Sequence, residues 1–225
     1  RDGDGVWRRY APFVIRVSED EIDPYMVYRL IEPGYETWGE MGIYQRCLET
    51  FREEPVIETS SAGYGCINCH TFRSQDPDMM LFHMRQTHAG TMLLREGRIE
   101  RLNTATDSTI SSTVYPSWHP SGRYIAFSVN ATKLITLPDE SNRVEVFDSA
   151  SDVVVYDTER HELYSVPELM RGDRFETFPS FSPAGDRLYF CTADSVEMPA
   201  RYKEARYSLC GIGFDAASGR IGRDV

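Results

Sequence analysis

Two stretches of this chain repeat one detailed pattern of aromatic, proline, serine and glycine residues. Residues 115–128 read YPSWHPSGRYIAFS, and residues 178–191 read FPSFSPAGDRLYFC. In each copy an aromatic residue and Pro-Ser precede a second aromatic residue, a Pro-x-Gly turn and a strand with alternating side chains. A long-period repeat of this kind indicates an architecture of stacked, similar units.

The repeat predicts a mainly β fold that contains part of a β-propeller. Each copy is followed by a strand that ends in an aromatic residue and aspartate, at residues 153–158 and 212–219. Residues 92–99 are expected to supply the outer strands of the preceding blade. A four-stranded blade cannot bury both faces alone, so blades stack around an axis. The alternative is a β-sandwich with two similar hairpins.

The chain divides into three expected regions. Residues 1–60 form a β-rich N-terminal region, with strands at Phe13–Val17 and Tyr25–Ile31 and a turn at Glu32–Gly34. Residues 61–90 form a cysteine–histidine segment with a short helix over Asp76–His88. Residues 91–225 form the propeller blades of an incomplete ring. Gly42–Phe51 is compatible with either a strand or a helix.

Two segments between the expected strands exceed an ordinary hairpin turn. Residues 129–152 and 194–206 are expected to be inserted loops, which in a propeller would bind a partner. Cys191 and Cys210 could meet across a hairpin as a disulfide, or stay free as small apolar residues of a blade. His119 lies in a blade turn and is expected to be structural. Asp157 and Asp215 are expected to form turns.

Charge excludes one large class of partner. The formal net charge is -11 and the isoelectric point is about 4.9, so nucleic acid would be repelled. No apolar run is long enough to span a membrane. The chain begins at Arg1 without a methionine or signal peptide, and a processed start with the export signal removed is expected.

The repeats resemble those of TolB-like propellers. More narrowly, the chain resembles a family of bacterial envelope proteins that join a β-rich N-terminal region, a C-x-x-C-H segment and such a propeller. The resemblance covers Tyr25–Trp38, Cys66–His70, Leu81–Arg85 and the first repeat. It implies export to the periplasm or cell envelope, and membership of a longer protein with more blades.

The C-x-x-C-H segment has the form used for covalent attachment of haem c. Cys66 and Cys69 would each add to a haem vinyl group, and His70 would be an axial ligand of the iron. His83 is the preferred second axial ligand, since it belongs to a stretch that resembles the family. The other candidates for this position are His88, Met79, Met80 and Met84.

A zinc site competes with haem for the same segment. Cys66, Cys69, His83 and His88 fit the generic Cys2His2 spacing. The third alternative is a plain disulfide, or two free thiols with surface histidines.

These patterns predict a non-enzymatic binding scaffold of the envelope, which carries haem c and contacts a protein or glycan partner through propeller loops. The alternatives are a redox protein that uses the haem, a hydrolase with its site at the propeller axis, or a zinc-stabilised adaptor. No catalytic residue is assigned, because the chain contains no G-x-S-x-G, phosphate-binding-loop or H-E-x-x-H motif.

Overall fold

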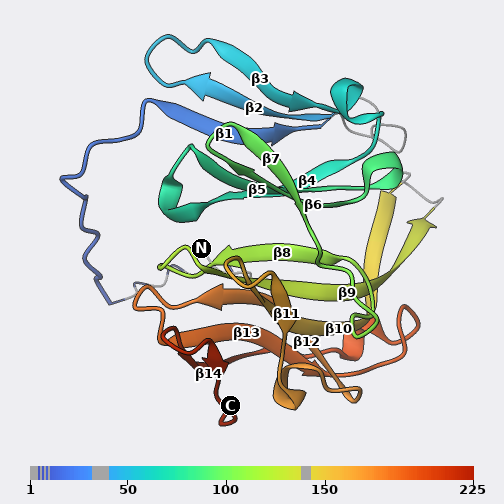
Figure 1. Cartoon of the computed structure of the whole chain (residues 1–225). Coiled ribbons are helices and arrows are strands. Elements are labelled where there is room, and N and C mark those ends of the chain that lie inside the picture. Colours follow the sequence, from blue (N-terminus) through green and yellow to red (C-terminus); the bar gives the residue numbers. More distant parts are fainter. Residues whose placement is uncertain (1–4, 6, 8, 10, 32–40, 138–142) are drawn as a thin grey trace.

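The described residues form three β-sheets, of three, four and eight strands, and the eight-stranded sheet divides into two antiparallel halves, so that four antiparallel units are stacked in sequence order (Figure 1). This computed structural model describes residues 5, 7, 9, 11–31, 41–137 and 143–225. The last two units are joined by one parallel bridge between Ser151 and Phe175. The expected mainly β fold, with propeller blades, is confirmed.

The four units, called blades 1 to 4, follow the chain. Blade 1 holds β1 (Tyr25–Leu30), β2 (Gly42–Cys47) and β3 (Glu53–Glu58). Blade 2 holds β4 (Ile67–Phe72), β5 (Met79–Met84), β6 (Gly90–Arg95) and β7 (Arg98–Leu102). Blade 3 holds β8 (Thr113–Trp118), β9 (Tyr124–Leu137), β10 (Arg143–Asp157) and β11 (Glu162–Tyr164). Blade 4 holds β12 (Arg174–Phe181), β13 (Arg187–Asp194), β14 (Ser208–Asp215) and β15 (Arg220–Ile221). Short 3-10 turns are η2 (Thr59–Ala62), η3 (Arg73–Gln75), η4 (Gln86–His88), η5 (Pro167–Leu169) and η6 (Tyr202–Glu204).

The two sequence repeats occupy equivalent places in blades 3 and 4. Trp118 pairs with Ile125 in blade 3, as Phe181 pairs with Leu188 in blade 4. Each first strand also has a bulge at the same point of the repeat. It falls between Val114 and Ser117 in blade 3 and between Thr177 and Ser180 in blade 4. The repeat is therefore a structural one, as the sequence predicted.

Blade 2 contains a third copy of this geometry, which the sequence analysis missed. Asn68 pairs with His83, and after a bulge Phe72 pairs with Met80, in the same register as the other two blades. The first residue of each bulge has a positive φ: 54° at Cys69, 50° at Tyr115 and 53° at Phe178. The C-x-x-C-H segment thus runs into the first strand of an ordinary blade. The sheet β4–β7 continues across the expected boundary after residue 90.

The helix expected over Asp76–His88 is wrong, because these residues form β5 and its flanking turns. All six residues of β5 are buried, since the strand lies between β4 and β6 with both faces covered. A strand buried on both faces is a continuous apolar run, which spacing alone cannot distinguish from a helix.

The N-terminal region is partly as expected. Tyr25–Leu30 forms a strand, and Gly42–Cys47 also forms one rather than a helix. Phe13–Val17 has a strand-like sequence but forms no strand in the described chain, and Phe13 is 81% exposed. The expected turn at 32–34, and the family stretch as far as Trp38, lie outside the described residues.

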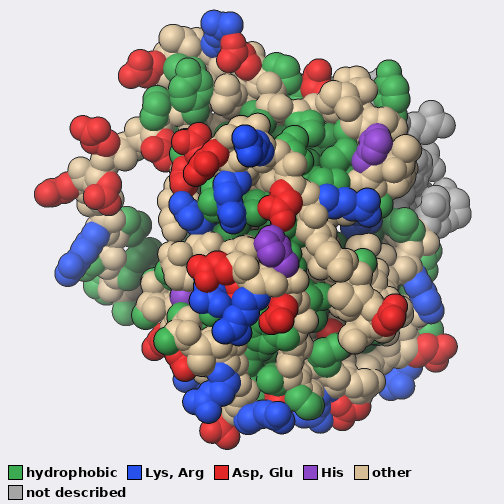
Figure 2. Space-filling view, viewed as in Figure 1, with side chains coloured by type: hydrophobic (Ala, Val, Ile, Leu, Met, Phe, Trp, Pro, Cys, Tyr) green, Lys and Arg blue, Asp and Glu red, His purple; other side chains and the backbone are tan. Residues whose placement is uncertain are grey.

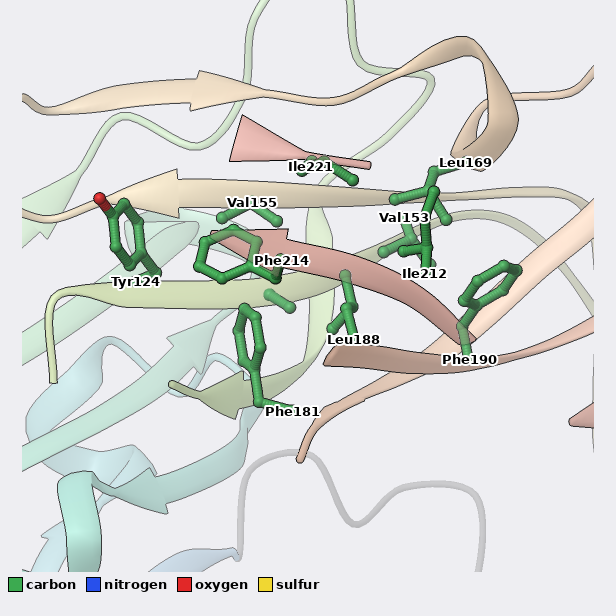
Figure 3. Close-up of a cluster of buried hydrophobic side chains, with 11 residues drawn as sticks. Tyr124, Val153, Val155, Leu169, Phe181, Leu188, Phe190, Ile212, Phe214 and Ile221 are labelled. Atoms are coloured by element: carbon green, nitrogen blue, oxygen red, sulfur yellow. The ribbon is translucent and has the colours of Figure 1, made fainter. Parts of the chain in front are cut away.

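The hydrophobic cores lie between neighbouring blades. Figure 3 shows the cluster between blades 3 and 4, where Tyr124 and Val155 face Phe181, Leu188 and Phe214. A second cluster joins blades 2 and 3, and a third joins blades 1 and 2. The burial follows from alternation along each strand, which sends one set of side chains to each neighbouring blade.

His119 is structural, as expected. It is buried, its Nδ1 accepts a hydrogen bond from the Ser121 backbone N–H, and its Nε2 donates to the Gly185 carbonyl at 2.9 Å. The histidine therefore ties the turn of one repeat to the turn of the next. Asp157 also acts as expected, since its carboxylate accepts hydrogen bonds from the backbone N–H groups of Glu159 and Arg160 in a turn.

The insertions differ from the loops that were expected. Residues 129–137 and 143–152 extend β9 and β10 as a paired hairpin, which rises along one side of the stack (Figure 1). The 195–207 loop after β13 includes η6, and its Tyr202 ring packs 5.3 Å from the ring of Phe147 in the hairpin. Lys133 also donates to the Met198 carbonyl at 3.2 Å. The two insertions thus support one another.

The open question of a Cys191–Cys210 disulfide is answered by the strand register. All five cysteines are free. Cys210 pairs with Phe190 and Cys191 pairs with Leu209, so the two thiols lie on opposite faces of the sheet.

Candidate functional site

A cavity of about 670 Å³ lies between blades 2 and 3, at the end from which the hairpin projects. It is bounded where β5 and β7 end and where β6 and β8 begin, with one wall from β9. Hydroxyl and amide side chains dominate its lining. The polar members are Gln86, Thr91, Asn103, Thr104, Ser111, Ser112, Thr113, Asn130 and Thr132, with His83, Arg85 and Arg101.

His83 is the most deeply placed ionisable group of the cavity. It lies near the end of β5, is 5% exposed, and its ring centroid is 5.9 Å from that of Phe127 in blade 3. Burial, together with the positive charge of Arg85, lowers the pKa of His83 to about 4. The imidazole is therefore neutral at pH 7.

Three buried threonines determine which nitrogen of His83 carries the proton. The hydroxyls of Thr91, Thr104 and Thr113 lie 2.9–3.0 Å from one another, and Thr91 Oγ1 is also 2.9 Å from His83 Nδ1. Four hydrogen bonds need four protons, but three hydroxyls supply three. The fourth must come from an Nδ1–H group, which leaves His83 Nε2 as a bare acceptor. This atom is buried and has no hydrogen-bond partner in the described chain.

Asn130 supplies a second unpartnered acceptor. It lies on β9, is 4% exposed, and donates through Nδ2 to Asp148 Oδ2 at 2.8 Å. A carboxylate accepts hydrogen bonds, so this contact fixes the orientation of the amide. Asn130 Oδ1 is then buried without a donor among the described residues. Burial raises the pKa of Asp148, and the bond from Asn130 opposes that change.

The charged side chains that line the cavity have one sign, whereas Asp148, which bonds to Asn130, is outside the lining. Arg85 and Arg101 are exposed at its edge, and Arg101 lies over Gly90, where an added Cβ would be 2.7 Å from Arg101 Nε. None of the residues that line the cavity is an aspartate or glutamate. By contrast, acidic and basic side chains are interspersed over the face shown in Figure 2. The cavity is thus suited to a ligand that donates hydrogen bonds and carries negative charge.

The residues predicted to hold haem are separated in the structure. Cys66 is 2% exposed, and burial raises the pKa of its thiol. His70 packs edge-on to Phe72 on the blade 1 side, whereas His83 faces blade 3 from the other side of the sheet. In this arrangement a haem vinyl group cannot reach Cys66, and His70 and His83 cannot flank one iron. The segment as folded does not fit an attached haem c.

The predicted zinc ligands are also not brought together. His88 is exposed in η4 and lies beside Gly63, whereas His83 is enclosed against Phe127. Among the described residues no group of three or more His, Cys, Asp or Glu side chains could hold a metal ion.

Native thiol labelling should separate the cysteines by their surroundings. Hydrogen bonds from the Thr50 hydroxyl and from the backbone at Thr50 and Glu49 lower the pKa of Cys47. At pH 8, Cys47 is expected to react with Ellman's reagent at least about tenfold faster than Cys66, because thiolate and access both favour it. Peptide mapping would assign the sites, and all five thiols should react in guanidinium. Fast labelling of Cys66 would show that β4 opens.

The site was only partly visible in the sequence. His83 was singled out, but as a haem ligand, while Asn130 fell in an expected loop and the three threonines carry no spacing signal. Their contact depends on the pairing of β5 with β6 and on the packing of Thr113 in β8, from the next blade, against Thr91 in β6. The most useful signal would have been the third copy of the repeat, because it identifies Ile67–Phe72 and Met79–Met84 as strands of a blade.

Comparison with known proteins adds information on the fold alone. No family model and no curated protein matches the chain. A solved structure described as TolB from Agrobacterium tumefaciens is 14% identical, with a TM-score of 0.49 over 84% of this chain and 55% of that one. An ancestral GH74 enzyme is 13% identical, with a TM-score of 0.49 over 81% of this chain and 22% of that one. Oligogalacturonate lyase from Vibrio parahaemolyticus is 13% identical, with a TM-score of 0.37 over 88% of this chain and 64% of that one. The chain spans about half the length of the TolB structure.

Proposed function

We propose that the chain is part of a TolB-like propeller scaffold of the bacterial envelope, which binds a protein or glycan partner without chemical change. One observation carries this proposal. The two insertions of the repeat, the β9–β10 hairpin and the 195–207 loop, project at the same end and contact each other beside the polar cavity. Rigid blades that carry loops at one end are a common arrangement for recognition.

The hairpin offers a surface of its own for such a partner. Leu134 and Val146 pair directly across the two strands and are 60% and 59% exposed. The base of the hairpin is held by a small apolar cluster that includes Phe147, Phe175 and Met198. The arrangement presents an exposed apolar pair on a fixed support, next to a cavity with polar walls.

Location in the periplasm or cell envelope belongs to the same proposal and is supported by the resemblance of the repeats to TolB-like propellers. No helix in the described part of the chain is long and apolar enough to cross a membrane. The alternatives, a haem c redox protein, a hydrolase with its site at the axis or a zinc-stabilised adaptor, are separated by an absorption spectrum and metal analysis of protein made in an export-competent host.

The test is to remove the hairpin without disturbing the blade. Residues 134–146 would be replaced by Asn-Gly, which closes a two-residue turn between the paired residues Lys133 and Phe147. Binding to isolated periplasmic protein and to an array of bacterial envelope glycans is expected to be saturable for the full chain and at least about tenfold weaker for the variant.

The matched control lies at the opposite end of a blade. Glu96→Lys alters the exposed turn between β6 and β7, and its binding should equal that of the full chain. Equal binding by the hairpin variant would contradict the proposal. Release of glycan fragments during the assay would instead favour the hydrolase.

A further inference from the structure

Two buried acceptor atoms, on side chains that line the cavity, have no hydrogen-bond donors in the described chain. His83 Nε2 and Asn130 Oδ1 both belong to side chains that are more than nine-tenths buried, and both side chains line the same cavity. A buried acceptor without a partner costs free energy, because it has lost its hydrogen bonds to water and gained none in return. A ligand that brings hydroxyl or amine donors into the cavity would recover this cost.

The charge at the edge of the cavity selects among such ligands. Arg85 is close enough to His83 to lower the pKa of the imidazole, and the Arg101 side chain lies over Gly90, where β6 begins. Neither arginine forms a salt bridge with a carboxylate among the described residues. In a chain of net charge -11, two arginines without acidic partners disfavour a cationic ligand such as an amine.

We propose that this cavity binds an acidic carbohydrate, whose hydroxyls donate to His83 Nε2 and Asn130 Oδ1 and whose carboxylate pairs with Arg85 and Arg101. The inference rests on the proposed binding function and names the chemistry of one ligand. A volume of about 670 Å³ falls within the range of pockets that hold small molecules and accommodates one or two sugar units. The remaining threonine, serine and asparagine side chains can exchange hydrogen bonds with further hydroxyls.

The test uses three probes that separate the two parts of the recognition. D-Glucuronate carries hydroxyls and a carboxylate, D-glucose carries hydroxyls alone, and glutarate carries carboxylates alone. In nuclear magnetic resonance titrations of the full chain, glucuronate is expected to bind at least about tenfold more tightly than either of the others. On binding, the ¹⁵N signal of His83 Nε2 should move away from the position of a free, unprotonated nitrogen.

The variants avoid the buried residues, whose loss would affect folding. Arg85→Gln and Arg101→Gln, both at exposed positions, should each weaken glucuronate binding by about tenfold and leave glucose binding unchanged. Arg98→Gln is the matched control, since Arg98 is exposed on the same sheet outside the cavity lining and should bind as the unmodified chain does.

Several results would overturn the inference. Equal affinity for glucose and glucuronate would show that the carboxylate is not recognised. Equal affinity for glutarate and glucuronate would show that the hydroxyls are not recognised. An unchanged His83 signal during saturable binding would place the ligand elsewhere. If none of the probes binds while the hairpin still determines partner binding, the inference fails and the proposed function stands. If the cavity binds glucuronate but the hairpin has no effect on any partner, the proposed function fails instead.

Discussion

Replacing Phe127 with alanine is expected to lower the free energy of unfolding by about 3–5 kcal/mol. Phe127 is fully buried in β9 and belongs to the cluster that joins blades 2 and 3. Its ring also forms the wall against which His83 packs. The substitution removes a large apolar side chain from a region where two sheets meet, so the cavity left behind cannot collapse without moving a blade.

Urea unfolding followed by tryptophan fluorescence would measure this loss. Phe13→Ala, at an 81% exposed position, is the matched control and should change the free energy of unfolding by less than about 0.5 kcal/mol. The control also tests the exposure of the 13–17 segment, because a large loss there would show that this segment packs in solution. A loss below about 1 kcal/mol for Phe127→Ala would contradict the view that contacts between blades hold the chain together.

The same contacts explain why the propeller could be predicted from the sequence. A blade can be recognised in the sequence when it has both the Pro-x-Gly turn and the aromatic residues of the repeat, as around Trp118 and Phe181. Blade 2 lacks these signs. Its turn contains Ser74 and Gln75, with φ of 48° and 64°, where the other copies have the Pro-x-Gly sequence, and Cys69-His70 stand in the bulge where the others have an aromatic residue and proline.

The prediction of haem at Cys66–His70 shows what a short pattern leaves open. The spacing of two cysteines and a histidine says nothing about whether the segment is an exposed loop or a buried strand. Here the pairing of β4 with β5 buries Cys66 and directs His70 and His83 to different faces. Only long-range pairing decides this, because each residue taken alone is compatible with both structures.

The cavity was beyond sequence analysis for a related reason. His83, Thr91 and Thr113 come from three strands, and Asn130 comes from the part of β9 that extends beyond the blade. The site is of interest because two buried acceptors, His83 Nε2 and Asn130 Oδ1, have no hydrogen-bond donor in the described chain. A missing donor can be recognised only when all neighbours of the acceptor are known. The arginines are similar, since their significance depends on the absence of acidic residues from the lining.

Glu176→Gln is expected to stabilise the chain at pH 8 relative to the unmodified protein by about 3 kcal/mol, and by no more than about 1 kcal/mol at pH 5. Glu176 is 1% exposed on β12, and burial raises its pKa to about 7 although the Arg171 backbone N–H donates to its carboxylate at 3.3 Å. The nearby charge of Asp152 acts in the same direction as burial. Because the folded-state pKa lies above the unfolded value of 4.5, the folded chain holds the extra proton between these two values. Stability from this group is therefore complete below about pH 4.5 and is lost as the pH rises through 7.

The difference between the two proteins is the quantity to measure, by urea unfolding at pH 5 and at pH 8. His83 has the opposite sign over part of this range, since its lowered pKa makes the folded chain less stable as the pH falls below about 6.5, so the curve of the unmodified protein alone does not isolate Glu176. His83 is present in both proteins, and its contribution cancels in the difference. Glutamine has the shape of the protonated acid and can also accept and donate hydrogen bonds, which is why the two proteins should agree to within about 1 kcal/mol at pH 5. Glu197→Gln, at an exposed position in the 195–207 loop, is the control and should give the same difference at both pH values. A Glu176→Gln effect that does not change between pH 5 and pH 8 would show that this carboxylate is as well solvated in the folded chain as in the unfolded one.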